Sequence, residues 1–443
     1  MRLLRVFLAT AFIATPSISL ADFCDAQSDP KAYPARFSWA GQIYGDPSSD
    51  FLYIPSDLIS DGDLDEDEAA LLTMIVDHLS AQGTNAAFVI PVPRLVTASE
   101  AYGVTQDQID AVEAGYRRLL TQLNDIGFVT PNPLDAIGGN AELLTTYNLP
   151  KDTHWSPVGT LQSAMALRSA IIEAGILDLD PLGAEYRLGP DAIFELEGGL
   201  ARMLGEVCPV ELPNEAVTYS VVEQNNGSAS SGDLLFGDVA QKFDVLLVGT
   251  SFTNKENNDV LLWSDSIRYS LQVDPTNIGV PGGEMYTSML HYALKQEEYG
   301  APELLVWEAL WTHRRNDWSE HLRMIYGELI GACTTAASTV SMDLPQDAKW
   351  TELFSGQTEA ERLSFVVPGL ETGRVRLRVT YPDGDREQIK LVRKDRLVGA
   401  LEHPEWTVFL GDLNGQSPEK IEFQVIGQSE PMSISASVCA APN

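Results

Sequence analysis

Residues 242–252, KFDVLLVGTSF, carry the strongest signal for a buried strand in the chain. Residues 245–248 are all apolar, as expected for a strand that is covered on both of its faces. Gly249 and Thr250 then turn the chain sharply and leave the hydroxyl of Ser251 exposed at the end of the strand. Because ligands bind outside the carboxyl ends of the strands in open α/β sheets, we expect a ligand-binding site next to Ser251.

Further strands lie on both sides of this segment. NAAFVIPVPR at 85–94 is typical of a short buried strand, and TNIGVPGGEMYTSMLHYALKQ at 276–296 predicts a strand followed by a helix. PELLVWEAL at 302–310 predicts another strand, which ends with Trp307 and Glu308 at the rim of the expected site.

Two helices have clear start signals. Thr105 and Gln108 form a capping box before an apolar-periodic stretch that ends at Gly127, and Ser156 is a natural N-cap before Pro157. Strands that alternate with helices of this length predict an α/β fold, a parallel sheet covered by helices on both faces. After the second helix, the chain makes a long acidic, Gly-containing excursion to about residue 240.

The pattern changes beyond Cys333. Apolar and polar residues now alternate, and PDGD and GDLNG are turn sequences, so we expect a small all-β sandwich. The chain is therefore predicted to have three segments: a signal peptide at 1–21, an α/β domain at 22–335 and a β-sandwich module at 336–443.

The first residues are typical of a secretory signal. Arg2 and Arg5 precede an apolar run that is too short to span a bilayer, and Ser19 and Ala21 supply the small side chains of a cleavage site. We therefore expect cleavage near Ala21 and export, with a periplasmic location.

The four cysteines, an even set in an exported chain, predict two disulfides. Three connectivities are possible. The spacing favours Cys24 with Cys208 and Cys333 with Cys439, because the second pair then closes off one C-terminal segment.

The formal charge of −34 is unevenly spread. Residues 1–344 hold 18 Lys and Arg against 48 Asp and Glu, and residues 345–443 hold 11 against 15. The electrostatic field of so acidic a chain repels phosphates and so excludes nucleic acid as a partner. It also excludes a simple basic groove for an anionic polymer.

Residues 151–159, KDTHWSPVG, place a carboxylate and an imidazole just before a helix. A serine needs a base to become a nucleophile, and His154 is the natural candidate for Ser251. Asp152 could hold the imidazole in the required tautomer, and the chain order is no obstacle because such triads are defined by geometry. Each piece alone also fits an ordinary strand end or helix cap, but together they favour acyl chemistry.

The N–H of Ser251 is one candidate donor to an oxyanion. The amides of Gly282 and Gly283 are two further candidates, because glycines let a substrate approach the backbone, although the same residues also fit a turn before a helix. The six histidines show no paired spacing typical of metal ligands, so we expect neither a metal nor a cofactor.

DTHWSPVG, followed much later by VGTSF and VPGG and then by a disulfide-closed β-domain, resembles the periplasmic alginate O-acetyltransferases. These combine an SGNH-hydrolase-like domain with a C-terminal carbohydrate-binding module. Ordinary SGNH hydrolases carry the serine first and the histidine last, and the reversed order here is similar to a circular permutation. The resemblance implies that Ser251 is the nucleophile, His154 the base and Asp152 its orienting acid.

The same resemblance implies an acetyl-serine intermediate and a membrane-bound protein that delivers the acetyl group. It also suggests the disulfide pairing that the spacing favours. We expect the chain to be a monomer.

Six residues are candidates for binding a sugar. Trp155 could stack on a ring, although an indole beside a helix start is more often part of the core. Alternation places three arginines on one strand face, which could grip uronate carboxylates or could simply be solvated. The basic candidates are Arg374, Arg376, Arg378, Lys394 and Arg396.

Three functions remain open at this level. The first is an O-acetyltransferase that acts on hydroxyls of an exported polysaccharide, alginate or a related anionic or neutral polymer. The second is an exported carbohydrate esterase with the same triad, and the third is a non-catalytic scaffold that binds polysaccharide. An acidic α/β domain would repel a polyanion such as alginate, so the polymer is not decided by the sequence.

Overall fold

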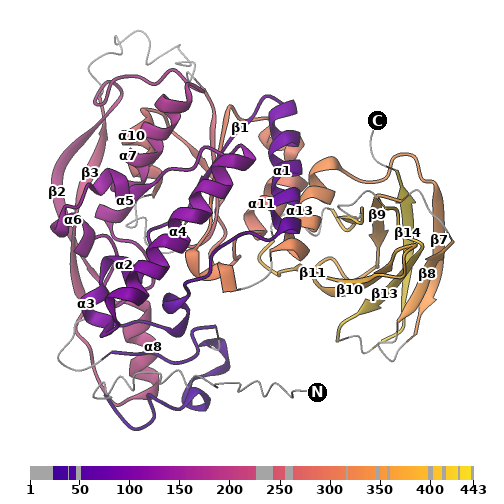
Figure 1. The fold of residues 1–443 in the computed structure, drawn as a ribbon, viewed down its shortest axis with the longest axis horizontal. Coiled ribbons are helices and arrows are strands. Elements are labelled where there is room, and N and C mark those ends of the chain that lie inside the picture. Colours follow the sequence, from indigo (N-terminus) through magenta and orange to yellow (C-terminus); the bar gives the residue numbers. More distant parts are fainter. Residues whose placement is uncertain are drawn as a thin grey trace, which may run out of the picture.

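The computed structural model describes residues 23–37, 39–45, 51–225, 243–254, 263–315, 318–345, 350–356, 360–397, 403–411, 416–427 and 430–440. The predicted signal peptide lies outside these residues. Figure 1 shows a larger α/β part and, beside it, a β-sandwich formed by the C-terminal residues. Within the described residues, no helix is long and apolar enough to cross a membrane.

A parallel four-stranded sheet forms the centre of the α/β part, in the order β1-β6-β4-β5. The residues of β4 and β6 are all buried, which is why each is a nearly unbroken apolar run. The predicted parallel sheet is thus confirmed. Its strands are β1 (Asn85–Val89), β4 (Val245–Val248), β5 (Thr276–Asn277) and β6 (Leu304–Glu308).

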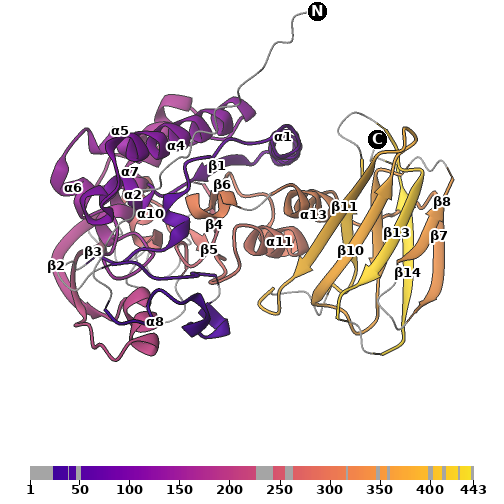
Figure 2. The same cartoon turned by 60° about the horizontal axis from the view of Figure 1, so that its bottom comes forward.

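Helices cover both faces of this sheet (Figure 2). On one face α7 (Pro157–Ala174) packs against α10 (Trp263–Leu271), and on the other α13 (Ser319–Ile330) packs against α1 (Glu66–Ala81) and α11 (Thr287–Leu294). The remaining helices are α2 (Arg94–Thr97), α3 (Ser99–Tyr102), α4 (Gln106–Ile126), α5 (Pro133–Ile137), α6 (Ala141–Thr145), α8 (Gly199–Val207), α12 (Gln296–Tyr299) and the 3₁₀ turns η1 (Pro30–Ala32), η2 (Ala35–Phe37), η3 (Pro55–Leu58) and η5 (Trp311–Arg315).

The helix starts follow the local signals. Thr105 and Gln108 form the capping box of α4, whose C-cap, Gly127, adopts a φ of 117°. The Ser156 hydroxyl accepts hydrogen bonds from the N–H groups of Val158 and Gly159, so α7 begins at the proline as predicted.

The acidic excursion contains an antiparallel ribbon, β2 (Tyr186–Leu196) with β3 (Glu215–Gln224), and α8 between the two strands. Most of the ribbon's side chains are exposed or half-buried, so its alternation of apolar and polar residues is weak. The disulfide Cys24–Cys208 joins the N-terminal segment to the end of α8. This layer was not visible in the sequence.

The C-terminal part is an antiparallel sandwich of two four-stranded sheets, β11-β10-β13-β8 and β12-β9-β14-β7, as predicted. The disulfide Cys333–Cys439 joins the segment before β7 to the end of the last strand. The strands are β7 (Ser338–Leu344), β8 (Thr351–Ser355), β9 (Arg362–Val366), β10 (Gly373–Thr380), β11 (Arg386–Arg393), β12 (Trp406–Phe409), β13 (Lys420–Val425) and β14 (Met432–Cys439).

Candidate active site

Two loops distant in sequence meet at the carboxyl end of the central sheet. One precedes α7 and is closed by a short antiparallel bridge between Asn148 and Trp155. The other follows β4 and carries Ser251. Both line a cavity of about 420 Å³.

The side chains of Ser251, His154 and Asp152 lie in line. The Ser251 Oγ is 2.8 Å from Nε2 of His154, and the other ring nitrogen, Nδ1, contacts Oδ1 of Asp152. The imidazole packs against the ring of Phe252, with centroids 4.5 Å apart, and its side chain is 12% exposed. The geometry can pass a proton from the hydroxyl to the ring while the carboxylate holds the opposite N–H.

Two backbone N–H groups hold the carboxylate of Asp152 in addition to its contact with the ring. Its Oδ1 accepts from the N–H of His154 at 3.1 Å, and its Oδ2 accepts from the N–H of Gly199 at 2.7 Å. Gly199 is the first residue of α8, whose N-terminal N–H groups favour a negative charge. The acidic, Gly-containing excursion therefore contributes a donor that orients the carboxylate of Asp152.

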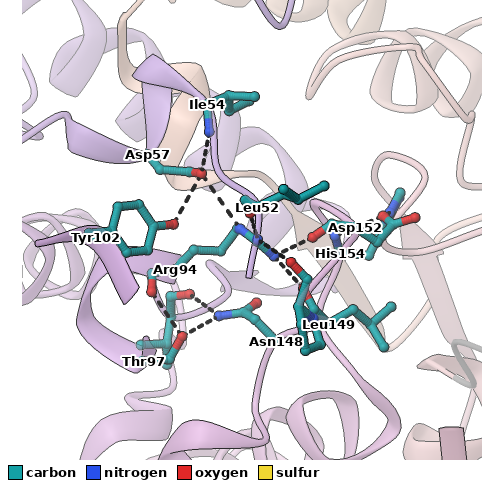
Figure 3. A network of polar contacts seen from close by, with 12 residues as sticks. Leu52, Ile54, Asp57, Arg94, Thr97, Tyr102, Asn148, Leu149, Asp152 and His154 are labelled. Atoms are coloured by element: carbon teal, nitrogen blue, oxygen red, sulfur yellow. Dashed lines mark hydrogen bonds and ion pairs between the residues drawn. The ribbon is translucent and has the colours of Figure 1, made fainter. Parts of the chain in front are cut away.

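Arg94 contacts the same loop through its guanidinium (Figure 3). Its guanidinium donates to the carbonyl oxygens of Leu52 at 2.6 Å and Leu149 at 2.7 Å, and also to that of Asp152. Its Nε lies 3.6 Å from the carboxylate of Asp57, and both side chains are almost fully buried. Arg94 is the first residue of α2, which follows the end of β1 after a short connection, so the guanidinium ties this segment to the loop that carries His154.

Asp57 is held by more than this ion pair. It accepts hydrogen bonds at 3.1 Å from the N–H of Ile54 and the hydroxyl of Tyr102. Burial nevertheless raises the pKa of its carboxyl, against the lowering effect of Arg94 and of these donors. Neither Arg94 nor Asp57 was recognised in the sequence, where the only signal was an arginine at the end of the apolar segment 85–94.

Glu308 supports the loop of Ser251 in the same way. Its Oε2 accepts from the N–H of Thr250 at 2.8 Å and from the hydroxyls of Thr250 and Thr253 at 2.9 and 3.1 Å. A Cβ on Gly249 would lie 2.6 Å from this oxygen, so only glycine fits between the strand and the carboxyl. Glu308 was expected at the rim of the site, but it is fully buried beneath the loop that carries Ser251.

Burial raises the pKa of Glu308 to about 7, although hydrogen bonds from Thr250 and Thr253 oppose the shift. Between the ordinary value of 4.5 and about 7, the folded chain holds a proton that the unfolded chain has lost. Stability therefore falls as the pH rises through this window, by about 3 kcal/mol from this group. We expect Glu308→Gln, which cannot ionise, to remove that part of the slope in urea unfolding measured from about pH 4 to about pH 8. Parallel profiles for the two proteins would contradict this.

The structure distinguishes the two candidate oxyanion glycines. Gly282 lines the cavity with Ser251 and adopts a φ of 66°. The N–H of Gly283 donates instead to the carbonyl of Val280 at 2.9 Å. Gly283 is thus committed to the turn, which contradicts its prediction as an oxyanion donor.

The suggestion that Trp155 stacks on a sugar ring is wrong as well. Its side chain is fully buried and packs against Phe252 and Trp263, with centroids 5.7 and 4.8 Å away, so its ring faces are closed to a sugar. The cavity is also lined by Trp39, which is 46% exposed, whereas Phe252 and Trp311 on the same wall are buried. Trp39 was not singled out in the sequence, because it lies after η2 in a segment that shows no helix or strand periodicity.

The basic candidates fall into two groups. Arg374 is exposed and Arg376 and Arg378 are half-buried on the outer face of β10, where Arg378 pairs with Glu422 at 3.4 Å. Lys394 and Arg396 follow β11 and contact the loop of Gly282 instead. Lys394 also lines the cavity.

Among the described residues, no cluster of three or more His, Cys, Asp or Glu side chains could hold a metal ion. The reactive groups that the structure brings together are the hydroxyl of Ser251, the imidazole of His154 and the carboxylate of Asp152.

Comparison with known proteins places this architecture. The probable alginate O-acetylase AlgJ of Pseudomonas putida is 28% identical over 168 residues, 36% of this chain and 41% of that protein. The AlgJ of Pseudomonas aeruginosa is 26% identical over 254 residues, 55% of this chain and 62% of that protein. The alignments thus span less than two thirds of these relatives.

The structure of Pseudomonas aeruginosa AlgX superposes with a TM-score of 0.69 at 16% identity, over 95% of this chain and 99% of that one. This similarity of fold includes the β-sandwich. The family model of the SGNH hydrolase-like domain, acetyltransferase AlgX, matches residues 51–310. This chain therefore belongs to the AlgX family of SGNH hydrolase-like acetyltransferases.

Proposed function

We propose that this protein is a polysaccharide O-acetyltransferase in which Ser251 carries the acetyl group from donor to acceptor. The observation that carries the proposal is the contact of 2.8 Å between His154 Nε2 and Ser251 Oγ, two residues that are 97 positions apart in sequence. Asp152 contacts the opposite nitrogen of the ring, so the three groups have the arrangement of a nucleophile, its base and the acid that orients the base. Family membership adds acetyl transfer as the reaction type.

In the first step, the Ser251 oxygen attacks the carbonyl carbon of the donor's acetyl group while His154 takes the hydroxyl proton. Asp152 stabilises the imidazolium. The N–H groups of Ser251 and Gly282 are the proposed donors to the oxyanion. His154 then gives its proton to the leaving group, and an acetyl-serine remains.

In the second step, His154 deprotonates a sugar hydroxyl, whose oxygen attacks the acetyl-serine. The carbon–oxygen bond to Ser251 breaks, and the serine recovers its proton from His154. The acetyl ester is now on the sugar. Water in place of the sugar would make the same enzyme an esterase.

The acceptor is proposed to bind with a sugar ring against Trp39 at the cavity and with the polymer along the arginine face of β10. Alginate is named for the relatives, and it is the acceptor that we propose for this chain. The two disulfides are typical of an extracytoplasmic protein, and we place the reaction in the periplasm. There, a membrane-bound protein would supply the acetyl group.

Product analysis tests this function. The protein is incubated with a small acetyl ester and an alginate oligosaccharide, and products are weighed by mass spectrometry. We expect acetylated oligosaccharide. Release of acetate alone would favour the esterase, and no turnover with retained polymer binding would favour the scaffold.

A further inference from the structure

The turn after β11 reaches out of the β-sandwich and holds the loop at 281–284. The Lys394 ammonium donates to the carbonyl of Gly282 at 3.0 Å and to the carboxylate of Glu284 at 2.8 Å. The Arg396 guanidinium donates to the carbonyl of Pro281 at 2.6 Å. Two side chains of the C-terminal part thus contact three residues of one loop of the α/β part, Pro281, Gly282 and Glu284.

That loop is connected directly to the nucleophile. The N–H of Val280 donates to the carbonyl of Gly249 at 3.0 Å, two residues before Ser251. Beyond the loop, the indole N–H of Trp307 donates to the carbonyl of Met285 at 2.8 Å. Between these anchors, Gly282 lies on the cavity wall shared with Ser251 and His154.

The loop adopts a conformation that needs external support. Glu284 has a φ of 56°, in the left-handed region that a residue with a Cβ rarely adopts. Its carboxylate is the group that Lys394 binds. The Lys394 ammonium also lies 5.5 Å from the centroid of Tyr286, so both sides of the strained residue are in contact with this cation.

These contacts are separate from those that dock the sandwich. Arg393 pairs with Glu328 of α13 at 2.5 Å, and Glu328 also accepts from the N–H of Thr407. Arg323 of α13 donates to the carbonyl of Gly411 at 2.9 Å. These buried groups hold the sandwich on α13 without Lys394, so they remain in place when Lys394 is replaced.

We propose that the β-sandwich is part of the catalytic site, with Lys394 and Arg396 as positioning residues that hold the loop at 281–284 in register with Ser251. This rests on the proposed acyl transfer at Ser251. The sandwich then contributes to acylation itself, including acylation by a donor that carries no sugar. A module that only binds polymer would not affect that reaction.

The test is the acetylation of Ser251 by 4-nitrophenyl acetate, followed as a burst of nitrophenolate. We expect Lys394→Met to lower the acylation rate constant roughly 10²-fold, because a small displacement of reacting groups has effects of that size. Lys394→Arg should recover most of the rate, since a guanidinium can still donate to both acceptors. Lys420→Met is the matched control: it removes a cation from β13 that pairs with Glu352 at 3.0 Å, far along the sheet from this loop.

Hydrogen exchange of the amides at 282–285 provides a readout that does not depend on activity. We expect faster exchange in Lys394→Met than in wild type and Lys420→Met. If Lys394→Met were acylated and exchanged its amides at the same rates as wild type, the inference would be overturned. If that variant also lost polymer binding, Lys394 would instead be a ligand for the sugar. If wild type were not acylated at Ser251, the proposed function would fail, while the exchange comparison would still decide the role of Lys394.

Discussion

Ser251→Ala is expected to lower acetyl transfer to an oligosaccharide by about 10⁴-fold or more, because no oxygen remains to take the acetyl group. His154 and Asp152 keep their positions in this variant, since neither depends on the serine for its other contacts. Cavity binding and the oxyanion donors survive and account for any residual rate. The measurement is the rate of acetylated product, together with the intact mass of the protein after exposure to an acetyl ester.

Wild type should gain the mass of one acetyl group, and Ser251→Ala should gain none. Ser169→Ala is a suitable control, because Ser169 is an exposed residue of α7 whose hydroxyl donates to the carbonyl of Met165 in the same helix. Retention of the wild-type rate by Ser251→Ala would reject the nucleophile and leave the scaffold as the better description.

Arg94→Ala is expected to destabilise the α/β part by about 3 to 5 kcal/mol, the usual effect of removing one partner of a buried ion pair. Asp57 would stay buried at 2% exposure without its cation and would have to take up a proton or remain charged. The carbonyls of Leu52, Leu149 and Asp152 would lose their donor. The rate of acetyl transfer should fall as well, because the loop that carries His154 loses the hydrogen bonds from Arg94 that hold it in place.

Two further variants test this explanation. Arg94→Ala combined with Asp57→Asn should be more stable than Arg94→Ala alone, since the amide carries no charge to bury. Arg36→Ala removes an arginine that is 64% exposed and pairs with Glu206, so its effect should be within about 0.5 kcal/mol. Urea midpoints followed by tryptophan fluorescence compare the variants. Equal midpoints for Arg94→Ala and Arg36→Ala would contradict the role of Arg94.

The fold was predictable where local sequence is decisive. The apolar run of β4 can only be satisfied by burial on both faces, and Ser156 with Pro157 favours a helix start in almost any context. In β10, Val375, Leu377 and Val379 alternate with arginines and so define one inner face. The ribbon of β2 and β3 escaped because its side chains are too exposed to show such a pattern.

The candidate site was predictable only in part. Ser251, His154 and Asp152 stand out as residue types suited to acyl chemistry at the ends of predicted elements. Trp155 and Trp39 could not be told apart in the sequence, because each is a tryptophan next to a serine. Only packing against Phe252 and Trp263 buries the first, and only the cavity exposes the second.

The sequence by itself determined the order of strands and helices, the two-part fold and the residues able to perform the chemistry, because these depend on periodicity and residue type within a short window. The tertiary structure decided which groups support them. Arg94 holds the loop of His154 and Glu308 holds the loop of Ser251, each through a partner 58 positions away in sequence. Lys394 of the β-sandwich contacts Gly282 of the α/β part, 112 positions away. Contacts at such separations depend on how the chain folds back on itself, which local patterns do not encode.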